Sequence, residues 1–350
     1  MRDSKKAILS TCLVVLLIVC LSLIILIQTA PFVHNYDWEL REELSGELDF
    51  LIIGASHGQC ALYTRTIDEI LGCNSYNLSY DSMKNYEKEY LLKKEIQRND
   101  IKTVVLELSY DTLFSSGKTD YTDANLFSTN RMDSFSDRLF YFFNYVRLNN
   151  KWYVYSDSMY EGMYAVKNGL SVEHSIDENQ YDLKGSRFID GKDHSLADEE
   201  IISSYNSKSY DVPNFNQETL DGFTEMIQLC RENGIRVIVA VVPVTDNYIW
   251  RYDKLDDFND WVSDYCRENG AEYYDFNLLK ERFELFSDAD CYSTDTHHMS
   301  EKGSRIFSKV FSEIIMCSGK GDDVSELFYD SFELEKLDSP YMEYYITHND

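Results

Sequence analysis

Two short segments far apart in the sequence carry residues that could together perform nucleophilic catalysis. In the first, Ser56 and His57 follow the apolar run Asp49–Gly54, which is typical of a buried strand that ends in a tight turn. In the second, Asp295 stands three residues before His298. A serine hydroxyl becomes a good nucleophile when a histidine takes its proton, and a carboxylate that orients the histidine completes the arrangement. The two segments therefore predict a triad of Ser56, His298 and Asp295.

Each of these residues also has an ordinary structural interpretation. Ser56 could cap the helix that follows the turn, and His57 could lie at the surface without a chemical role. A metal site is a further alternative, offered by four residues that are close in the sequence, namely Cys291, Asp295, His297 and His298. Because no second ligand group stands at a recognised spacing elsewhere, we expect neither a metal nor a cofactor.

The composition limits the kinds of partner that the protein can bind. The chain has 350 residues, of which 33 are basic and 61 acidic, and its formal net charge is −28. So acidic a protein repels nucleic acid, and this excludes nucleic-acid binding as its main function. The length and a hydrophobic content of 44% are sufficient for a large buried core.

The N-terminus predicts a membrane anchor. A short basic flank, residues 1–6, precedes the segment Ala7–Thr29, which contains no charged residue. This segment exceeds the ~20 residues that cross a bilayer, and the positive flank should remain in the cytoplasm. A cleaved signal peptide is the alternative, although its apolar region is usually shorter. We expect residues 1–30 to form a cytoplasmic flank and one transmembrane helix, with the rest of the chain on the outer side of the cell membrane.

Apolar segments alternate with helical patterns after a linker at residues 31–48. Strands are expected at Asp49–Gly54, Ser75–Leu78, Thr103–Leu108, Ile235–Val242 and Ala271–Asp275. Helices are expected at Ala61–Leu71, Tyr86–Arg98, Gln217–Asn233, Leu255–Asn269 and Ser300–Cys317. Strands separated by single helices predict an α/β fold, in which right-handed crossovers build a parallel sheet with helices on both faces.

A long segment, residues 110–216, interrupts this alternation. It is rich in Tyr, Phe, Asn, Asp and Ser, and we expect one amphipathic helix in it, near Asp133–Leu148. A loop of this length without structure is unusual in a compact domain, so we interpret the segment as an inserted cap, with a peripheral decoration as the alternative. Its aromatic residues could stack on sugar rings or form a core of their own, among them Trp152, Tyr153, Tyr155 and Tyr160. The acidic C-terminal tail, residues 318–350, could pack on the domain or fray.

On these residues the chain resembles the SGNH/GDSL hydrolase superfamily. The motifs that carry the resemblance are the strand followed by Gly54-x-Ser56, the late Asp295-x-x-His298 and Gly303. The resemblance implies a flavodoxin-like three-layer α/β/α sandwich, with the catalytic domain at residues 49–317 and the insertion at 110–216. It also implies cleavage or transfer of acyl esters, with Ser56 as nucleophile, His298 as general base and Asp295 as its orienting acid.

The residues that would bind the oxyanion depart from the pattern of the superfamily. A glycine that usually donates its N–H is replaced by Ser79, whose backbone N–H is expected to serve instead. The usual asparagine after the third strand is missing, because Asp111 stands in that region and an ionised carboxylate cannot donate a hydrogen bond. We expect Asn77 or His57 to take its place.

The anchored, outward-facing organisation further resembles proteins that acylate cell-surface polymers. These include the D-alanyl transfer proteins of teichoic acid synthesis and the alginate-type O-acetyltransferases. The resemblance implies a cell-surface carbohydrate and an acyl donor as substrates, and a multi-spanning membrane acyltransferase as partner. We therefore expect a membrane-anchored, extracytoplasmic serine acyltransferase or esterase. The alternative is a non-catalytic SGNH-like scaffold or glycan-binding protein in cell-envelope polymer assembly.

Overall fold

The computed structural model describes residues 2–29, 44–118, 125, 128–129, 132, 134–154, 156, 184–191, 208–209, 212, 214–249, 252–287, 289–293 and 297–339. The chain divides into two compact units. The smaller unit consists of Met1–Glu43 and Lys118–Ile176, and the larger unit consists of Leu44–Gly117 and Asp177–Asp350.

The larger unit contains a five-stranded parallel sheet. Its strands follow the order β2-β1-β3-β5-β7, and their bounds are β1 Phe50–Ile53, β2 Ser75–Asn77, β3 Thr103–Glu107, β5 Arg236–Val241 and β7 Glu272–Asp275. All neighbouring strands pair in parallel. The central strands are almost wholly buried because their residues are apolar on both faces of the sheet. The prediction of an α/β fold with a parallel sheet is confirmed, and the strand order is that of flavodoxin-like sheets.

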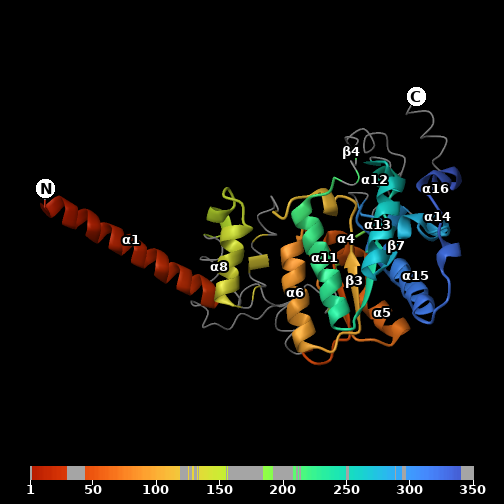
Figure 1. Cartoon of the computed structure of the whole chain (residues 1–350), viewed down its shortest axis with the longest axis horizontal. Helices are drawn as coiled ribbons and strands as arrows, with labels where there is room; N and C mark the ends of the chain where they lie inside the picture. The colour runs from red at the N-terminus through yellow and green to blue at the C-terminus, as the bar shows by residue number, and fades with distance from the viewer. Residues whose placement is uncertain are drawn as a thin grey trace. The chain divides into compact units, whose positions relative to one another are not determined.

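Helices cover both faces of this sheet. One layer contains α6 (Asn85–Arg98), α11 (Gln217–Glu232) and α13 (Leu255–Asn269), and Figure 1 shows α6 and α11 side by side. The other layer contains α4 (Ser56–Ala61), α5 (Thr64–Leu71) and α15 (Glu301–Gly319). Between this second layer and the sheet lies the main apolar core, which includes Phe50, Ile52, Val105, Ile238, Phe276, Phe307 and Phe311. This core fixes α4 and α15 against the strand ends.

Several short elements complete the larger unit. These are the helices α12 (Asp246–Ile249), α14 (Arg282–Leu285) and α16 (Phe332–Asp338), the paired strands β4 (Lys208–Ser209) and β6 (Tyr252–Asp253), and the 3-10 turns Thr112–Phe114, Phe276–Leu278, Ala289–Cys291 and Ser325–Leu327. The tail packs on the domain at least as far as Ser339, since Phe328 pairs with Leu279 and Phe332 is buried. Residues beyond Ser339 lie outside the described part.

The described helices of the smaller unit are α1 (Arg2–Thr29) and α8 (Phe135–Asn144). Helix α8 lies where the amphipathic helix of the insertion was expected. Trp152 and Tyr153 are 74% and 41% exposed, so these two rings do not form a buried core. Tyr155 and Tyr160 lie outside the described residues.

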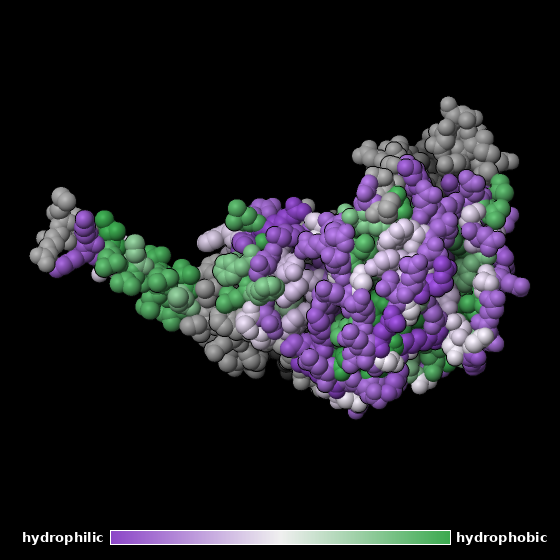
Figure 2. Space-filling model, viewed as in Figure 1, coloured by the Kyte–Doolittle hydropathy of each residue, from purple (hydrophilic) through white to green (hydrophobic). Residues whose placement is uncertain are grey.

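Helix α1 carries the N-terminal segment in which we expected a transmembrane helix. Its apolar side chains from Ile8 to Leu21 are largely exposed, as Figure 2 shows. Among the described residues, however, none of the helices combines the length and the apolar character needed to cross a bilayer. The membrane anchor stays a prediction.

Candidate active site

Ser56 lies at a turn between a buried strand and a helix. Strand β1 ends at Ile53, and Ser56 is the first residue of α4. The turn lies so close to the end of β3 that a Cβ atom on Gly54 would be only 2.5 Å from Glu107 Cβ, and one on Gly58 only 2.9 Å from it. Two glycines are therefore required for Glu107 to pack beneath the serine.

Backbone hydrogen bonds between the segments on either side of His298 fix the position of this residue. The N–H of Ser300 donates to the carbonyl of Cys291 at 2.9 Å, and the N–H of Ser293 donates to the carbonyl of His298 at 2.9 Å. This close approach requires Gly303, because a Cβ atom there would lie 2.2 Å from the Cys291 carbonyl oxygen. The glycine that the sequence singled out thus has a packing role: it allows α15 to approach the segment that carries the histidine.

The structure brings Ser56 and His298 together across 242 residues of sequence. His298 Nε2 lies 2.7 Å from Ser56 Oγ, which is within hydrogen-bond reach for a general base. The third member of the predicted triad, Asp295, lies outside the described residues. Its orienting role stays a prediction.

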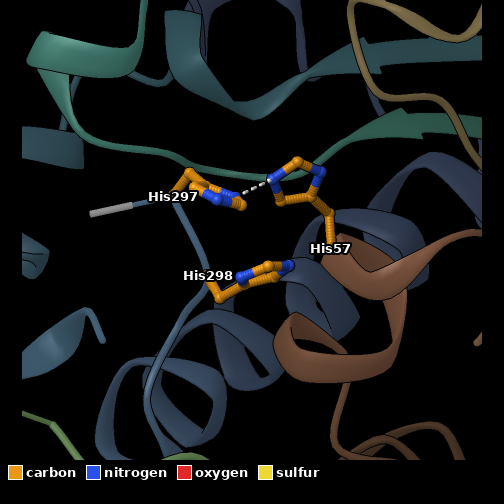
Figure 3. A group of neighbouring side chains, drawn as sticks. All are labelled: His57, His297 and His298. Atoms are coloured by element: carbon orange, nitrogen blue, oxygen red, sulfur yellow. Dashed lines mark hydrogen bonds between the residues drawn. The ribbon is translucent and has the colours of Figure 1, made fainter. Parts of the chain in front are cut away.

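His57 takes part in a hydrogen-bonded chain that begins at a buried carboxylate. Glu107 accepts the N–H of Ala55 at 2.7 Å through Oε2 and the hydroxyl of Ser109 at 2.6 Å through Oε1. Because the only hydroxyl proton of Ser109 goes to Glu107, Nδ1–H of His57 donates to Ser109 Oγ at 2.8 Å. In a neutral ring the other nitrogen, Nε2, is then the acceptor, and it lies 3.0 Å from Nδ1 of His297 (Figure 3).

The carboxylate at the base of this chain was not identified from the sequence. Glu107 is the last residue of β3 and is only 3% exposed. Lys88 of α6 is also buried, and burial lowers the pKa of its ammonium group while the negative charge of Glu107 acts in the opposite direction. The sequence did contain a signal for Glu107, because a charged residue at the end of an otherwise apolar buried strand is uncommon and often indicates a functional or ion-paired group.

The expected oxyanion donors are occupied by bonds within the protein. The N–H of Ser79 donates to Asn77 Oδ1 at 3.0 Å. The amide of Asn77 donates in turn to the carbonyls of Gly58 and Leu62, both at 3.0 Å. Asn77 therefore joins β2 to α4, and both its amide and the Ser79 N–H are engaged within the protein in this structure. The predicted oxyanion role of both residues would require these bonds to be exchanged for bonds to the oxyanion, and it stays a prediction.

A cavity of about 180 Å³ opens beside Ser56. It is lined largely by polar residues, among them Ser56, His57, Ser82, Lys84, Asn85, Ser109, Asp111, Ser115, Thr219 and Tyr248. Asp111 accepts a hydrogen bond from the Tyr252 hydroxyl at 3.0 Å, so it is an acceptor as the sequence indicated. Ser82 has a φ of 56°, a left-handed conformation that is uncommon for a residue other than glycine and is often found at functional sites.

Comparisons with known proteins give only distant likenesses. No protein-family model matches the sequence, and no curated protein matches it. A GDSL-like lipase from Bacteroides thetaiotaomicron is similar in structure, with 11% identity, a TM-score of 0.37 and coverage of 81% of this chain and 98% of the lipase. A proposed acylhydrolase from Bacteroides fragilis is similar with 10% identity, a TM-score of 0.36 and coverage of 81% and 95%. Both TM-scores are low, so the geometry of the site, and not these likenesses, is the basis for assigning a function.

Proposed function

We propose that the protein is a serine-dependent enzyme that hydrolyses or transfers acyl esters. The observation that carries this proposal is the 2.7 Å contact between Ser56 Oγ and His298 Nε2, at a strand-to-helix turn beside a cavity. A hydroxyl and an imidazole in this arrangement can open an ester by nucleophilic attack. A Ser56 that merely capped its helix would need no histidine at its hydroxyl.

The reaction would proceed through an acyl-enzyme. As Ser56 Oγ attacks the ester carbonyl, His298 Nε2 takes the hydroxyl proton, and the carbonyl oxygen becomes an oxyanion. The backbone N–H of Ser56, the first residue of α4, is the donor that we propose for this oxyanion. His298 then returns the proton to the leaving alcohol. Water or a sugar hydroxyl, deprotonated by His298, finally attacks the acyl-enzyme and releases Ser56.

We further propose a substrate, a location and a partner for this enzyme. The cavity of about 180 Å³ has room for a small acyl group. An acyl group on a cell-surface carbohydrate is the substrate that the sequence resemblance favours. An extracytoplasmic location at the cell membrane and a multi-spanning acyltransferase partner stay predictions of the same resemblance.

The nucleophile is tested with the full-length chain and p-nitrophenyl acetate. We expect a burst of p-nitrophenol in the wild type and an acetylated peptide that contains Ser56 by mass spectrometry. Ser56→Ala should remove the adduct, and both Ser56→Ala and His298→Gln should reduce kcat by about 10³-fold or more. Ser287→Ala, at an exposed serine, is the matched control and should leave the burst unchanged. Equal turnover in Ser56→Ala and wild type would overturn the proposal.

A non-catalytic glycan-binding role is the second candidate. It is favoured by the engagement of Ser79 and Asn77 inside the protein and by the exposed rings of Trp152 and Tyr153. Aromatic rings of this kind can stack on sugars. Glycan binding that is undiminished in Ser56→Ala, with no acyl adduct in the wild type, would support this second candidate and contradict the first.

A further inference from the structure

We propose that His57, His297 and His298 form a binding site for a divalent transition-metal ion of the Zn²⁺ class, beside the nucleophile. Each ring offers one nitrogen, and the three nitrogens lie within 4.8 Å of one another. Figure 3 shows the three side chains converging from two segments, His57 from α4 and the other two from the chain before α15. The sequence offered His297 and His298 as candidate ligands but not His57, which is 240 residues away from His297.

The spacing of the nitrogens fits a tetrahedral ion. With Zn–N bonds of about 2.0–2.1 Å, two ligand nitrogens in tetrahedral geometry lie about 3.3 Å apart. His57 Nε2 and His297 Nδ1 are already 3.0 Å apart. Small rotations of the side chains would bring the third nitrogen from its present separation, at most 4.8 Å, to the same distance. Three imidazoles favour zinc, copper, nickel or cobalt over magnesium or calcium.

The hydrogen bonds around His57 are those that a metal ligand needs. Histidines that bind metals usually donate their second ring N–H to a carboxylate, a carbonyl or water, which fixes the tautomer and aims the other nitrogen at the ion. Here His57 donates Nδ1–H to Ser109, which is itself bonded to Glu107. The Nε2 lone pair is thereby directed toward the other two rings. The net charge of −28 also favours the approach of cations.

Binding requires a change of protonation at His297. In the ion-free arrangement described above, its Nδ1–H donates to His57 Nε2. A ligand nitrogen must carry a lone pair, so His297 Nδ1 would give up this proton, either to solvent or by exchange to the other tautomer. Protons and the metal therefore compete for the same lone pairs, and we expect metal affinity to rise with pH.

Metal binding by the three histidines does not depend on the proposed function. The effect of a bound ion on enzymatic activity does, and it rests on that proposal. The lone pair of His298 cannot bind a metal and accept the proton of Ser56 at the same time. We therefore expect a bound ion to inhibit acyl transfer, and a chelator to restore it.

The site is tested by equilibrium dialysis of the full-length protein against Zn²⁺. We expect one ion per chain at micromolar or lower zinc concentration, and a visible spectrum of tetrahedral Co²⁺ in the cobalt form. His57→Gln and His297→Gln should each weaken binding by more than tenfold, and Ser109→Ala by about 10- to 100-fold. His348→Gln, near the C-terminus of the chain, is the control and should bind as the wild type does.

Two outcomes would overturn the proposal: the absence of saturable Zn²⁺ binding, or binding that is unchanged in His57→Gln and His297→Gln variants that keep the wild-type circular dichroism spectrum. Ser56→Ala separates this proposal from the enzymatic one, because it should lose ester cleavage and still bind Zn²⁺. Zinc binding in a protein without esterase activity would contradict only the proposed function. Esterase activity without zinc binding would contradict only the metal site.

Discussion

Two polar clusters of the larger unit use similar side chains in different surroundings. The site cluster, formed by Ser56, His57, Glu107, Ser109, His297 and His298, reaches a cavity through Ser56, His57 and Ser109. The arginine cluster is formed by Arg282, Asp246 and Glu335, whose side chains are only 4%, 5% and 1% exposed. Both contain buried carboxylates held by hydrogen bonds. The two clusters differ in their access to a cavity and not in the types of their residues. A network that reaches a cavity can contact a substrate, whereas a fully buried one can only hold elements together.

The arginine cluster joins three short elements. Arg282 of α14 donates to Asp246 of α12 at 2.6 Å and to Glu335 of α16. Two carboxylates thus share one guanidinium, and burial raises the pKa of Glu335 to about 7 despite the positive charge beside it. The hydroxyl of Ser339 completes the cluster by donating to Asp246 at 2.6 Å. The cluster therefore docks the C-terminal tail on the domain.

The largest effect is expected when the arginine cluster loses its cation. Arg282→Met should lower the free energy of unfolding by about 3–5 kcal/mol, because two buried carboxylates lose their partner. Arg267→Met is the control: its guanidinium is 71% exposed and pairs with Asp264 one turn away, so about 0.5 kcal/mol or less should be lost. Urea unfolding followed by circular dichroism measures both. If Arg282→Met kept its stability and lost ester cleavage, the distinction between the clusters would be wrong.

The sheet was predictable because its strands carry their own signal. A continuous apolar run such as Val237–Val242 is typical of a strand that is buried on both faces, and the structure places β5 (Arg236–Val241) there. The boundaries of the first two helices of the second layer were not predicted correctly. We expected one helix at Ala61–Leu71, whereas α4 ends at Ala61 and α5 begins at Thr64. A six-residue helix that contains Gly58 is too short to show a helical period in the sequence.

The part of the site that could be predicted from the sequence is the part that belongs to recognisable local motifs. The approach of Ser56 and His298 follows from the strand-to-helix turn and the late histidine, and the structure shows it. The partners of His57 could not be found in this way, because Ser109 and His297 reach it only through the pairing of β1 with β3 and the docking of α15. The engagement of Ser79 by Asn77 likewise depends on side-chain orientation, which residue spacing does not fix.

A smaller effect, on activity, should follow from a change to the carboxylate of the site cluster. Glu107→Gln keeps one acceptor oxygen and replaces the other by an amide N–H₂, which then faces either the Ala55 N–H or the Ser109 hydroxyl, although both of these groups donate. Hydrogen bonds to a charged group contribute about 1.5–3 kcal/mol, so kcat/KM for p-nitrophenyl acetate should fall by about 10- to 100-fold. The control is Glu95→Gln, a buried glutamate of α6 that accepts from Asn99 and should affect stability alone. Equal activity in both variants would remove Glu107 from the site cluster.

A third prediction concerns how stability depends on pH, and it tests a buried carboxylate outside both clusters, Asp275. Burial raises the pKa of Asp275 from 3.8 to about 6, against the hydrogen bonds of Tyr110 and Asn277. The folded state therefore holds the proton more readily than the unfolded state, so stability falls as the pH rises toward 6. Between pH 5 and pH 7 the wild type should lose about 1 kcal/mol relative to Asp275→Asn, which does not titrate. Urea unfolding at several pH values measures this difference, and a constant difference would contradict the assignment.

The smallest effect is expected at the Ser79 side chain, because the predicted role of this residue belongs to its backbone N–H, which Ser79→Ala keeps. Its hydroxyl is buried and has no hydrogen-bond partner in the described part of the chain, while its N–H is held by Asn77. Ser79→Ala should therefore leave activity unchanged and alter stability by less than about 1 kcal/mol, in the stabilising direction. Ser186→Ala is the matched comparison, because this equally buried hydroxyl donates to the Leu62 carbonyl at 2.9 Å and accepts from Thr64 N–H at 3.2 Å. It should lose about 1 kcal/mol. If Ser79→Ala instead lost ester cleavage at normal stability, its hydroxyl would belong to the site cluster, and burial without a partner would then mark a group that awaits substrate.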